Sequence, residues 1–352
     1  MRLEFLDRLS GNEVLGKSIL SSDGKVLLRA GVQLSGVYID KLKELGVFYV
    51  YVEDHRLDDV LVEDNKLTEL KQCAMKNMSR IIKNVSECNR RGVKDSISVV
   101  EEMVEYIIDM GDVNKSLYDI QTYDNYTYIH SLDTSIISSF LGLAAGFDSY
   151  KLKELAVGAI LHDIGKTKID YFIINKDGPL TEEEYFEIKK HPIYGGKILR
   201  KNIRISDEVI SAVEQHHERV DGRGYPYGLT GNQISKYGKI VSICDVYDAV
   251  SNDRVYRGKF SPNEAYELIL SGSGTLFDTG YVQDFRSTFS VYPLGCCVKL
   301  SDSTEGYVIK QNKNFPDRPV IRVLYDSESR EPVPFYEINL LENTNLVVES
   351  VV

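Results

Sequence analysis

Apolar residues recur at steps of three or four from residue 65 to 88, which places them on one face of a helix. A second helix is expected over residues 97–108, with Gly92 and Gly111 as breaks on either side. We expect this pair of helices to pack onto a neighbouring helical domain. Signal transmission and a homodimer contact are the alternatives. The residues of the first face are Leu67, Leu70, Ala74, Met78, Ile81, Val85 and Cys88.

The first 62 residues combine strand-like segments with Gly-containing turns. Residues 26–28 and 47–52 have strand composition, and a helical pattern lies near residues 38–45. Glu53 and Asp54 follow the second segment as in the phosphoacceptor strand of a receiver domain, but that fold needs repeated βα units. We therefore expect a small α+β domain with a structural or regulatory role.

The remainder of the chain changes character near residue 290. Residues 130–290 alternate helical patterns with short loops, so this region is expected to be all-α. Strand-like segments then follow at residues 298–300, 306–309, 320–325 and 346–348 and predict a small β-barrel or sheet. The expected units are an α+β domain over 1–62, a helical domain over 63–290 and a β-rich domain over 291–352.

Composition narrows the classes of function. The formal net charge of -11 argues against a general DNA or RNA binder, because polyanion binding needs a basic surface. No stretch approaches the run of ~20 apolar residues needed to span a membrane, and the N-terminus lacks the apolar segment of a signal peptide. The five cysteines show no paired zinc spacing. We expect reduced thiols and a cytoplasmic protein.

The residues that carry chemistry fall in the helical region. The segment Ala-Ile-Leu-His-Asp-Ile-Gly-Lys places His162 and Asp163 side by side, with Lys166 one turn later. His130 lies upstream, so five of the six histidines fall between residues 130 and 217. The downstream members are His191 before a proline, the pair His216-His217, the loop Asp221-Gly222-Arg223-Gly224-Tyr225-Pro226 and Asp245 in Cys-Asp-Val-Tyr-Asp-Ala.

This ordered series resembles the HD-GYP domain, a branch of the HD metal-dependent phosphohydrolases, over residues from about 100 to 290. A lone His-Asp dipeptide carries little weight, but the series in this order is specific. The resemblance implies an HD-type helical fold in a bacterial protein. It also implies a phosphodiesterase that opens the second messenger cyclic di-GMP to linear pGpG and, in some members, GMP.

The donor atoms predict a transition-metal centre. Imidazole nitrogens with carboxylate oxygens suit iron, manganese, zinc or nickel, whereas calcium and magnesium sites are dominated by oxygen. Seven side chains are too many for one ion. By resemblance, His130, His162 and Asp245 hold one ion with a bridging Asp163, and iron or manganese is expected before zinc or nickel. The resemblance assigns the second ion to His191, His216 and His217.

One position departs from the family pattern. Some members hold a third metal through a Glu one turn before the first His, and this chain has Tyr126 there. Asp124 and Asn125 lie on other faces of that turn, which favours two ions. Asp133 is either a hydrogen-bond acceptor behind His130 or part of a solvated helix surface.

Two divalent ions lower the pKa of a bridging water and clamp the attacked phosphoryl group. The expected reaction is therefore attack by a metal-bridging hydroxide, in line with the leaving 3′ oxygen. Asp163 is expected to steer this nucleophile. Lys166 is expected to offset the charge on the non-bridging oxygens.

The substrate contacts are expected from a loop and a helix. Tyr225, in the glycine-rich loop, is expected to stack on a guanine base, and Arg223 to contact phosphate or base. Arg254 and Arg257 are three residues apart, and the family uses a similar pair for phosphate. A plain turn and a salt-bridged helix surface are the alternatives for these two segments.

Three other functions stay open at this point. The sequence does not distinguish a phosphodiesterase for cyclic di-GMP from one for another cyclic dinucleotide, such as the hybrid of A and G. A di-iron oxygenase uses similar ligands, but Lys166 and the arginine pair favour phosphate. A non-catalytic cyclic dinucleotide receptor is disfavoured by the intact ligand set.

Overall fold

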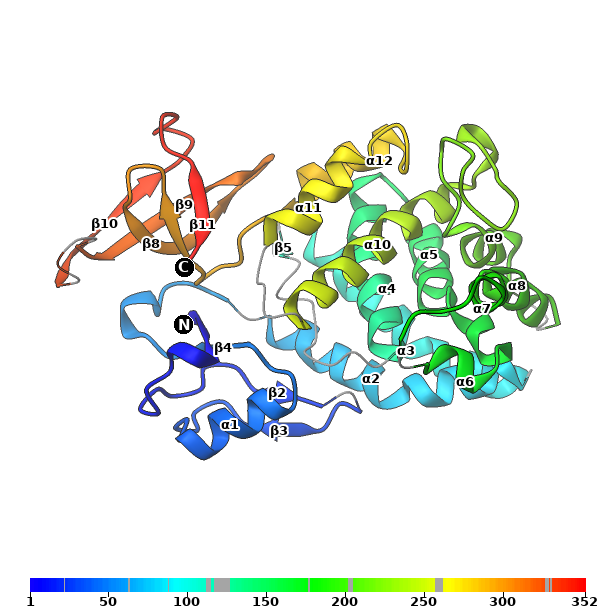
Figure 1. Ribbon diagram of the computed structural model, residues 1–352, viewed down its shortest axis with the longest axis horizontal. Coiled ribbons are helices and arrows are strands. Elements are labelled where there is room, and N and C mark those ends of the chain that lie inside the picture. The colour runs from blue at the N-terminus through cyan, green and yellow to red at the C-terminus, as the bar shows by residue number, and fades with distance from the viewer. Residues whose placement is uncertain are drawn as a thin grey trace.

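The computed structural model describes residues 1–21, 23–62, 64–87, 89–111, 115–116, 127–176, 178–201, 205–256, 262–326, 329 and 331–352. A small N-terminal module and a C-terminal sheet lie side by side at one end of a larger helical bundle (Figure 1). The helical majority with an α+β module before it and strands after it confirms the expected fold class. Among the described residues, no helix is long and apolar enough to cross a bilayer.

The N-terminal module pairs its strands antiparallel and packs them on one helix. Arg2 lies opposite Val52 and Phe5 opposite Tyr49, while a short hairpin forms the second sheet. Parallel βα units are absent from the described part of this module, which rules out the receiver interpretation. Its elements are β1 (Arg2–Phe5), β2 (Ile19–Leu20), β3 (Val26–Leu28), α1 (Gly36–Glu44) and β4 (Tyr49–Val52), with 3-10 turns at Leu6–Arg8 and His55–Leu57.

The predicted helix pair is α2 (Asn65–Ser86) and α3 (Arg90–Met110). The apolar face of α2 is buried in the same core as the bundle, and Ile81 is 0% exposed. This face is therefore covered within one chain, as expected for packing onto the helical domain. The expected break at Gly92 is wrong, because that residue lies inside α3. A glycine costs a helix only about 1 kcal/mol relative to alanine, which packing readily offsets.

A buried ion pair fastens α2 to the bundle. The Lys71 ammonium lies 2.7 Å from a carboxylate oxygen of Asp133 on helix α4 (Thr127–Ala144), and both side chains are buried. Asp133 is therefore not on a solvated helix surface. Removing one partner of a buried pair leaves an uncompensated charge, which is strongly destabilising.

The bundle begins with the adjacent helices α4 and α5, and later helices of the chain pack against this pair (Figure 1). Short loops join most of the helices, as the sequence pattern predicts. The elements are α4 (Thr127–Ala144), α5 (Ser149–Leu161), η4 (Ile164–Lys168), α6 (Tyr171–Ile174), α7 (Glu182–Ile188), α8 (His191–Lys201), α9 (Asp207–Gln215), η5 (Gly231–Gln233), α10 (Lys236–Tyr256), α11 (Pro262–Ser271) and α12 (Thr279–Thr288).

The C-terminal unit is a five-stranded antiparallel sheet with the order β10-β9-β8-β7-β11. Strand β10 was not expected, because Pro332 and Pro334 weaken its strand pattern. It lies at the edge of the sheet, where proline is tolerated because one side of the strand needs no partner. The strands are β7 (Cys297–Leu300), β8 (Glu305–Asn312), β9 (Phe315–Tyr325), β10 (Pro332–Asn339) and β11 (Val348–Val351).

The two flanking units contact each other directly. The Leu3 amide donates to the Gly295 carbonyl at 2.9 Å. Arg322 on β9 places its two terminal nitrogens 2.7 Å from the two carboxylate oxygens of Asp59, and it also binds Glu337. Such a forked pair fixes orientation as well as distance. The bundle elements α8 and α9 lie at the end of the molecule away from this contact (Figure 1).

Candidate metal centre

The seven predicted ligand residues come from separate elements that converge in the bundle. His130 lies in the first turn of α4, and Asp245 lies in α10. His162 and Asp163 follow the end of α5, where the chain turns into η4. His191 begins α8, while His216 and His217 follow α9. Three of these residues (His162, His191 and His216) are no more than 1% exposed.

A close approach at Gly165 joins these elements. A Cβ atom at this position would overlap the carbonyl oxygen of His191. Only glycine lets η4 pack this tightly on the start of α8, because it has no side chain. The contact brings Asp163 within reach of His191, whose Nε2 lies 3.3 Å from Asp163 Oδ1.

Backbone carbonyls orient three of the imidazoles in the same way. The Nδ1 atoms of His162, His191 and His216 lie 2.7, 2.8 and 2.8 Å from the carbonyl oxygens three residues earlier. A carbonyl oxygen can only accept, so Nδ1 carries the proton in each ring. In the neutral imidazole, Nε2 then has a free lone pair, which is the form that binds metal ions.

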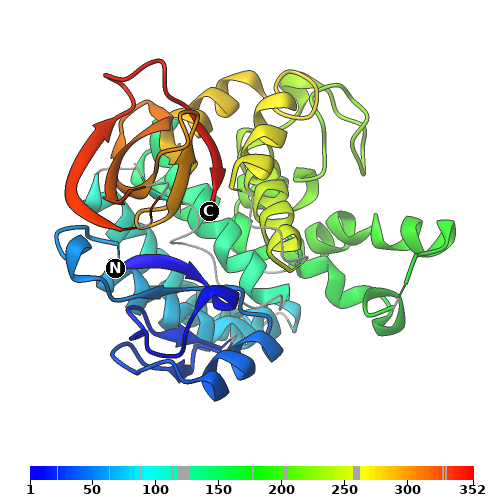
Figure 2. The same ribbon diagram turned by 60° about the vertical axis from the view of Figure 1, so that its left-hand side comes forward.

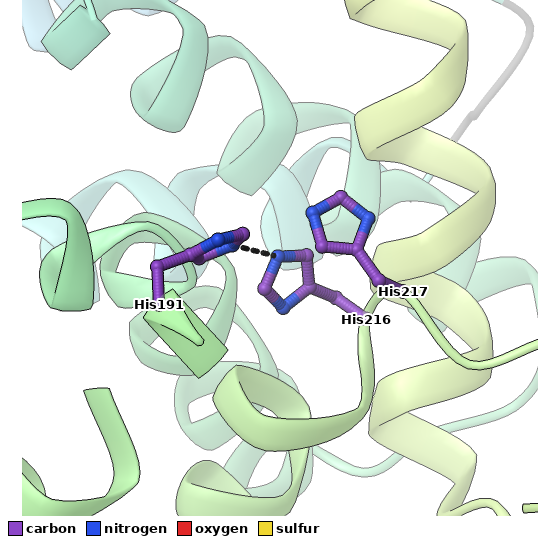
Figure 3. A group of neighbouring side chains, drawn as sticks. All are labelled: His191, His216 and His217. Atoms are coloured by element: carbon purple, nitrogen blue, oxygen red, sulfur yellow. Dashed lines mark hydrogen bonds between the residues drawn. The ribbon is translucent and has the colours of Figure 1, made fainter. Parts of the chain in front are cut away.

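The first group consists of His191, His216 and His217, whose ligand atoms all lie within 4.8 Å of one another (Figure 3). His191 Nε2 lies 3.2 Å from His216 Nε2. Burial lowers the pKa of His191 to about 4 and also lowers the pKa values of His216 and His217. Two neutral rings with Nδ1–H bonds place lone pairs against each other, and a cation relieves that repulsion.

The second group consists of His130, His162 and Asp245, also within 4.8 Å. His130 Nε2 lies 2.8 Å from Asp245, and its Nδ1 lies 2.7 Å from Asp248. Burial by itself lowers the pKa of His130, but the hydrogen bonds to these two carboxylates outweigh it and raise the pKa well above 6.5. Both ring nitrogens therefore face α10, so Asp133 is not the acceptor behind His130.

Asp163 lies between the two groups. Its Oδ2 is 3.4 Å from His162 Nε2, and it forms a third cluster with His162 and His216. Burial opposes its charge, but His162 and Lys166 hold the pKa of Asp163 well below the ordinary value of 3.8. Within the described part of the chain, His162 Nε2 and Asp163 Oδ1 are buried without a hydrogen-bond partner. Unpaired buried polar atoms are costly, and a divalent cation would satisfy both.

Lys166 binds Asp163 rather than facing open solvent. Its Nζ atom lies 2.6 Å from Asp163 Oδ2, and its side chain is 33% exposed. Burial opposes the lysine charge, but the neighbouring carboxylate outweighs it and raises the pKa of Lys166. A positive charge therefore stays fixed beside the shared carboxylate.

The glycine-rich loop is held by a buried carboxylate. Glu218 accepts the backbone N–H groups of Tyr227 and Leu229 at 2.7 and 2.9 Å. Tyr225 stacks on His217 with ring centroids 4.6 Å apart. Arg223 is exposed, and its backbone N–H donates to Asp221 at the loop start. The loop thus places an aromatic ring directly on a candidate ligand.

Comparison with known proteins identifies two regions of the chain. The HD domain family matches residues 115–280, and a KOW domain associated with HD domains matches residues 297–352. Residues 115–280 belong to the HD domain family. The sequence resemblance to an HD-type domain is therefore confirmed, and all seven predicted ligands lie within the matched residues.

Curated relatives of this chain include two enzymes named as cyclic di-GMP phosphodiesterases. PA4108 of Pseudomonas aeruginosa is 31% identical over 242 residues, 69% of this chain and 58% of the relative. PdeB of Borreliella burgdorferi is 29% identical over 228 residues, 64% of this chain and 60% of the relative. The chain thus spans about three fifths of the length of these two relatives.

A third relative and one solved structure complete the comparison. The 3′3′-cGAMP-specific phosphodiesterase 1 of Vibrio cholerae is 32% identical over 170 residues, 48% of this chain and 38% of the relative. The solved structure of Bd1817, an HDG"Y"P protein from Bdellovibrio bacteriovorus, matches with a TM-score of 0.51 at 19% identity. It covers 80% of this chain and 97% of its own, and it shows that the fold is shared.

Sequence reasoning missed two buried carboxylates of the HD domain. Asp248 lies three residues after Asp245 on α10, so both reach the same side of the helix and bind the two nitrogens of His130. That spacing was visible in Cys-Asp-Val-Tyr-Asp-Ala. Glu218 directly follows the histidine pair, but its partners are backbone N–H groups, which a sequence does not mark.

Several expected positions cannot be compared with the structure. Arg254 lies in α10, but its side chain is not among those described, and Arg257 lies outside the described residues. Tyr126, Asp124 and Asn125 also lie outside the described residues. The expectation of two ions rather than three therefore stays a prediction.

Proposed function

We propose that this chain is a metal-dependent phosphodiesterase that hydrolyses cyclic di-GMP to linear pGpG. The observation that carries the proposal is the pair of ligand groups with Asp163 between them. The HD domain implies binding of divalent metal ions, and the two relatives with the longest matches given above are named as cyclic di-GMP phosphodiesterases. Further hydrolysis to GMP is part of the proposal.

The proposed cofactor is two transition-metal ions, with iron or manganese ahead of zinc or nickel. His191, His216 and His217 would hold one ion, and His130, His162 and Asp245 the other, with Asp163 shared. Nitrogen-rich ligand sets of this kind suit these metals better than magnesium or calcium. When bound, such ions activate water at neutral pH and polarise the phosphoryl group.

The remaining charged residues would act on the substrate. The Lys166 ammonium, fixed 2.6 Å from Asp163, would neutralise charge on the phosphoryl oxygens near the shared carboxylate. Asp163 would orient the attacking water by accepting its hydrogen bond. Arg254 and Arg257 are proposed phosphate ligands, and Arg223 lies on the exposed loop where it could reach the substrate.

We also propose the unit boundaries at residues 62 and 290, with the flanking units as regulators of the HD domain. A cyclic di-GMP substrate would place the enzyme in the bacterial cytoplasm. The hybrid cyclic dinucleotide is the second candidate substrate, because one relative is named as specific for 3′3′-cGAMP. A binding-only receptor is the third candidate, and the intact set of candidate ligands disfavours it.

Hydrolysis of cyclic di-GMP by anaerobically reconstituted protein tests this function. Products would be separated by chromatography for the parent loaded with iron or manganese and for Asp163→Ala. We expect pGpG from the parent alone, because the variant loses the carboxylate shared by both groups. His55→Ala is the matched control, since His55 lies outside the cluster and is exposed. No product from a parent that binds two ions would refute the proposal and favour the other two candidates.

A further inference from the structure

Two exposed aromatic side chains lie on the short helix α7. Tyr185 is 50% exposed and Phe186 is 62% exposed. The start of α7 is fixed by a capping box, in which Thr181 and Glu184 each bind the backbone N–H of the other. The green segment that carries α6 and α7 projects from the body of the molecule (Figure 2). The two rings are thus open to solvent on a helix whose start is fixed.

A lysine joins these rings to the candidate metal centre. Lys189 Nζ lies 4.4 Å from the ring centroid of Tyr185, 5.9 Å from that of Phe186 and 5.2 Å from that of Tyr225. Tyr225 in turn stacks on His217. The aromatic pair on α7 is therefore connected to a candidate metal ligand through a lysine and one further ring.

The charge of Lys189 is not neutralised by a neighbouring carboxylate within the described residues. Other lysines near α7 do have such partners: Lys176 binds Glu184 at 2.6 Å and Lys190 binds Glu187 at 2.5 Å. Lys189 instead rests against aromatic faces, which attract a cation by about 0.5–1 kcal/mol at exposed sites. Its ammonium is therefore positioned and free to donate hydrogen bonds to a ligand.

Tyr225 already has neighbours of its own. Its ring lies against His217 and near Lys189, so it is suited to positioning those two residues. A base that stacks near the metal centre would then need another aromatic surface. Tyr185 and Phe186 supply exposed rings at that place.

We propose that Tyr185, Phe186 and Lys189 form a wall that binds a guanine base of the substrate, an inference that rests on the proposed function. Aromatic rings stack on any base, so Tyr185 and Phe186 would supply affinity. Guanine presents two acceptors, O6 and N7, whereas adenine presents a donor at the position of O6. A lysine donor beside the stacked base therefore favours guanine, and Lys189 would set the preference of this site.

The test is steady-state hydrolysis of cyclic di-GMP and of cyclic di-AMP, which lacks guanine, by metal-loaded parent and variants. The double variant Tyr185→Leu with Phe186→Leu removes the stacking surface for one base. Its KM is expected to rise roughly tenfold or more. Tyr185→Phe keeps a ring and is expected to keep the parent KM. Lys189→Met is expected to lower the preference for cyclic di-GMP over cyclic di-AMP roughly fivefold or more.

Phe172→Leu is the matched control. Phe172 is 82% exposed on the neighbouring helix α6, and its ring partner is Tyr171. An unchanged KM in this control and a raised KM in the α7 variants would support the wall. Parent-like KM values and preference in the α7 and Lys189 variants would overturn this inference alone. A parent that cleaves neither dinucleotide would overturn the proposed function and the inference with it.

Discussion

The two ligand groups differ in charge although both are built around buried histidines. The group of His191, His216 and His217 contains only imidazoles, and burial lowers the pKa of each. In the group of His130, His162 and Asp245, carboxylates on α10 instead raise the pKa of His130. One group is therefore already in the neutral form that binds a cation, whereas the other must first release a proton.

Asp163 connects the two groups and keeps its own charge. The nearby His162 and Lys166 hold its pKa low despite burial. The difference between the groups thus teaches that carboxylates bonded to a buried histidine reverse the direction in which burial shifts its pKa. Two ions bound to these groups would differ in their dependence on pH even though they share a ligand.

The largest effect is expected from removing an imidazole of the first group. His191→Ala should abolish cyclic di-GMP turnover while the second group keeps its ion, since His130, His162 and Asp245 are unchanged. Metal analysis and a hydrolysis assay on the same sample check this. Retention of two ions together with turnover would show that His191 is not a ligand.

A smaller effect is expected behind the second group. Asp248→Asn should weaken metal binding at this group roughly 10- to 100-fold, because partners behind a ligand histidine contribute that much. The ion at the first group should keep its affinity, since Asp248 binds the ring of His130, which belongs to the second group. Competition with a chelator measures both affinities. An equal loss of metal affinity at the two groups would contradict the difference between them.

The contact between the groups is tested through Gly165. Gly165→Ala should lower the free energy of unfolding by about 1–3 kcal/mol, because the new methyl group overlaps the His191 carbonyl and overpacks the contact. Gly36→Ala is the matched control, since no atom lies within 4 Å of the added carbon there. Urea unfolding of the metal-free variants gives both values. A Gly165→Ala protein as stable as the control would contradict the close approach.

The smallest effect is a difference in titration between the groups. In the metal-free protein, His191 should lose its proton near pH 4, whereas His130 should stay protonated above pH 6.5. The raised pKa of His130 adds stability that is present below pH 6.5 and is lost as the pH rises through its folded value. The lowered pKa of His191 acts in the opposite sense, so stability falls as the pH drops from 6.5 toward 4. Nuclear magnetic resonance of the histidine rings would measure the titration of His191 and of His130. Titration of the two rings over the same pH range would contradict the comparison.

The sequence predicted the arrangement of elements where local patterns are strong. The apolar face of α2 and the strand-like segments of β7 to β9 follow helical or alternating spacing, which is set by residues near one another in the chain. Strand β10 was missed because its prolines hide an edge strand, and Gly92 did not break α3 because packing offsets its low propensity.

The candidate site was predictable in its residue types but not in its contacts. Motif spacing marked the ligand residues, whereas the pairing of Asp133 with Lys71 joins positions 62 residues apart in the chain. The contact of Lys189 with Tyr225 also depends on how two loops fold toward each other. Such contacts arise from tertiary packing, and a single sequence does not display them.

The central claim is that two ions held around Asp163 hydrolyse the substrate. The most direct measurement adds iron or manganese anaerobically to metal-free protein and records bound metal and cyclic di-GMP turnover at each step. We predict little turnover with the first ion and a rise to full turnover as the second ion binds. Full turnover with one ion per chain, or none with two, would contradict the account.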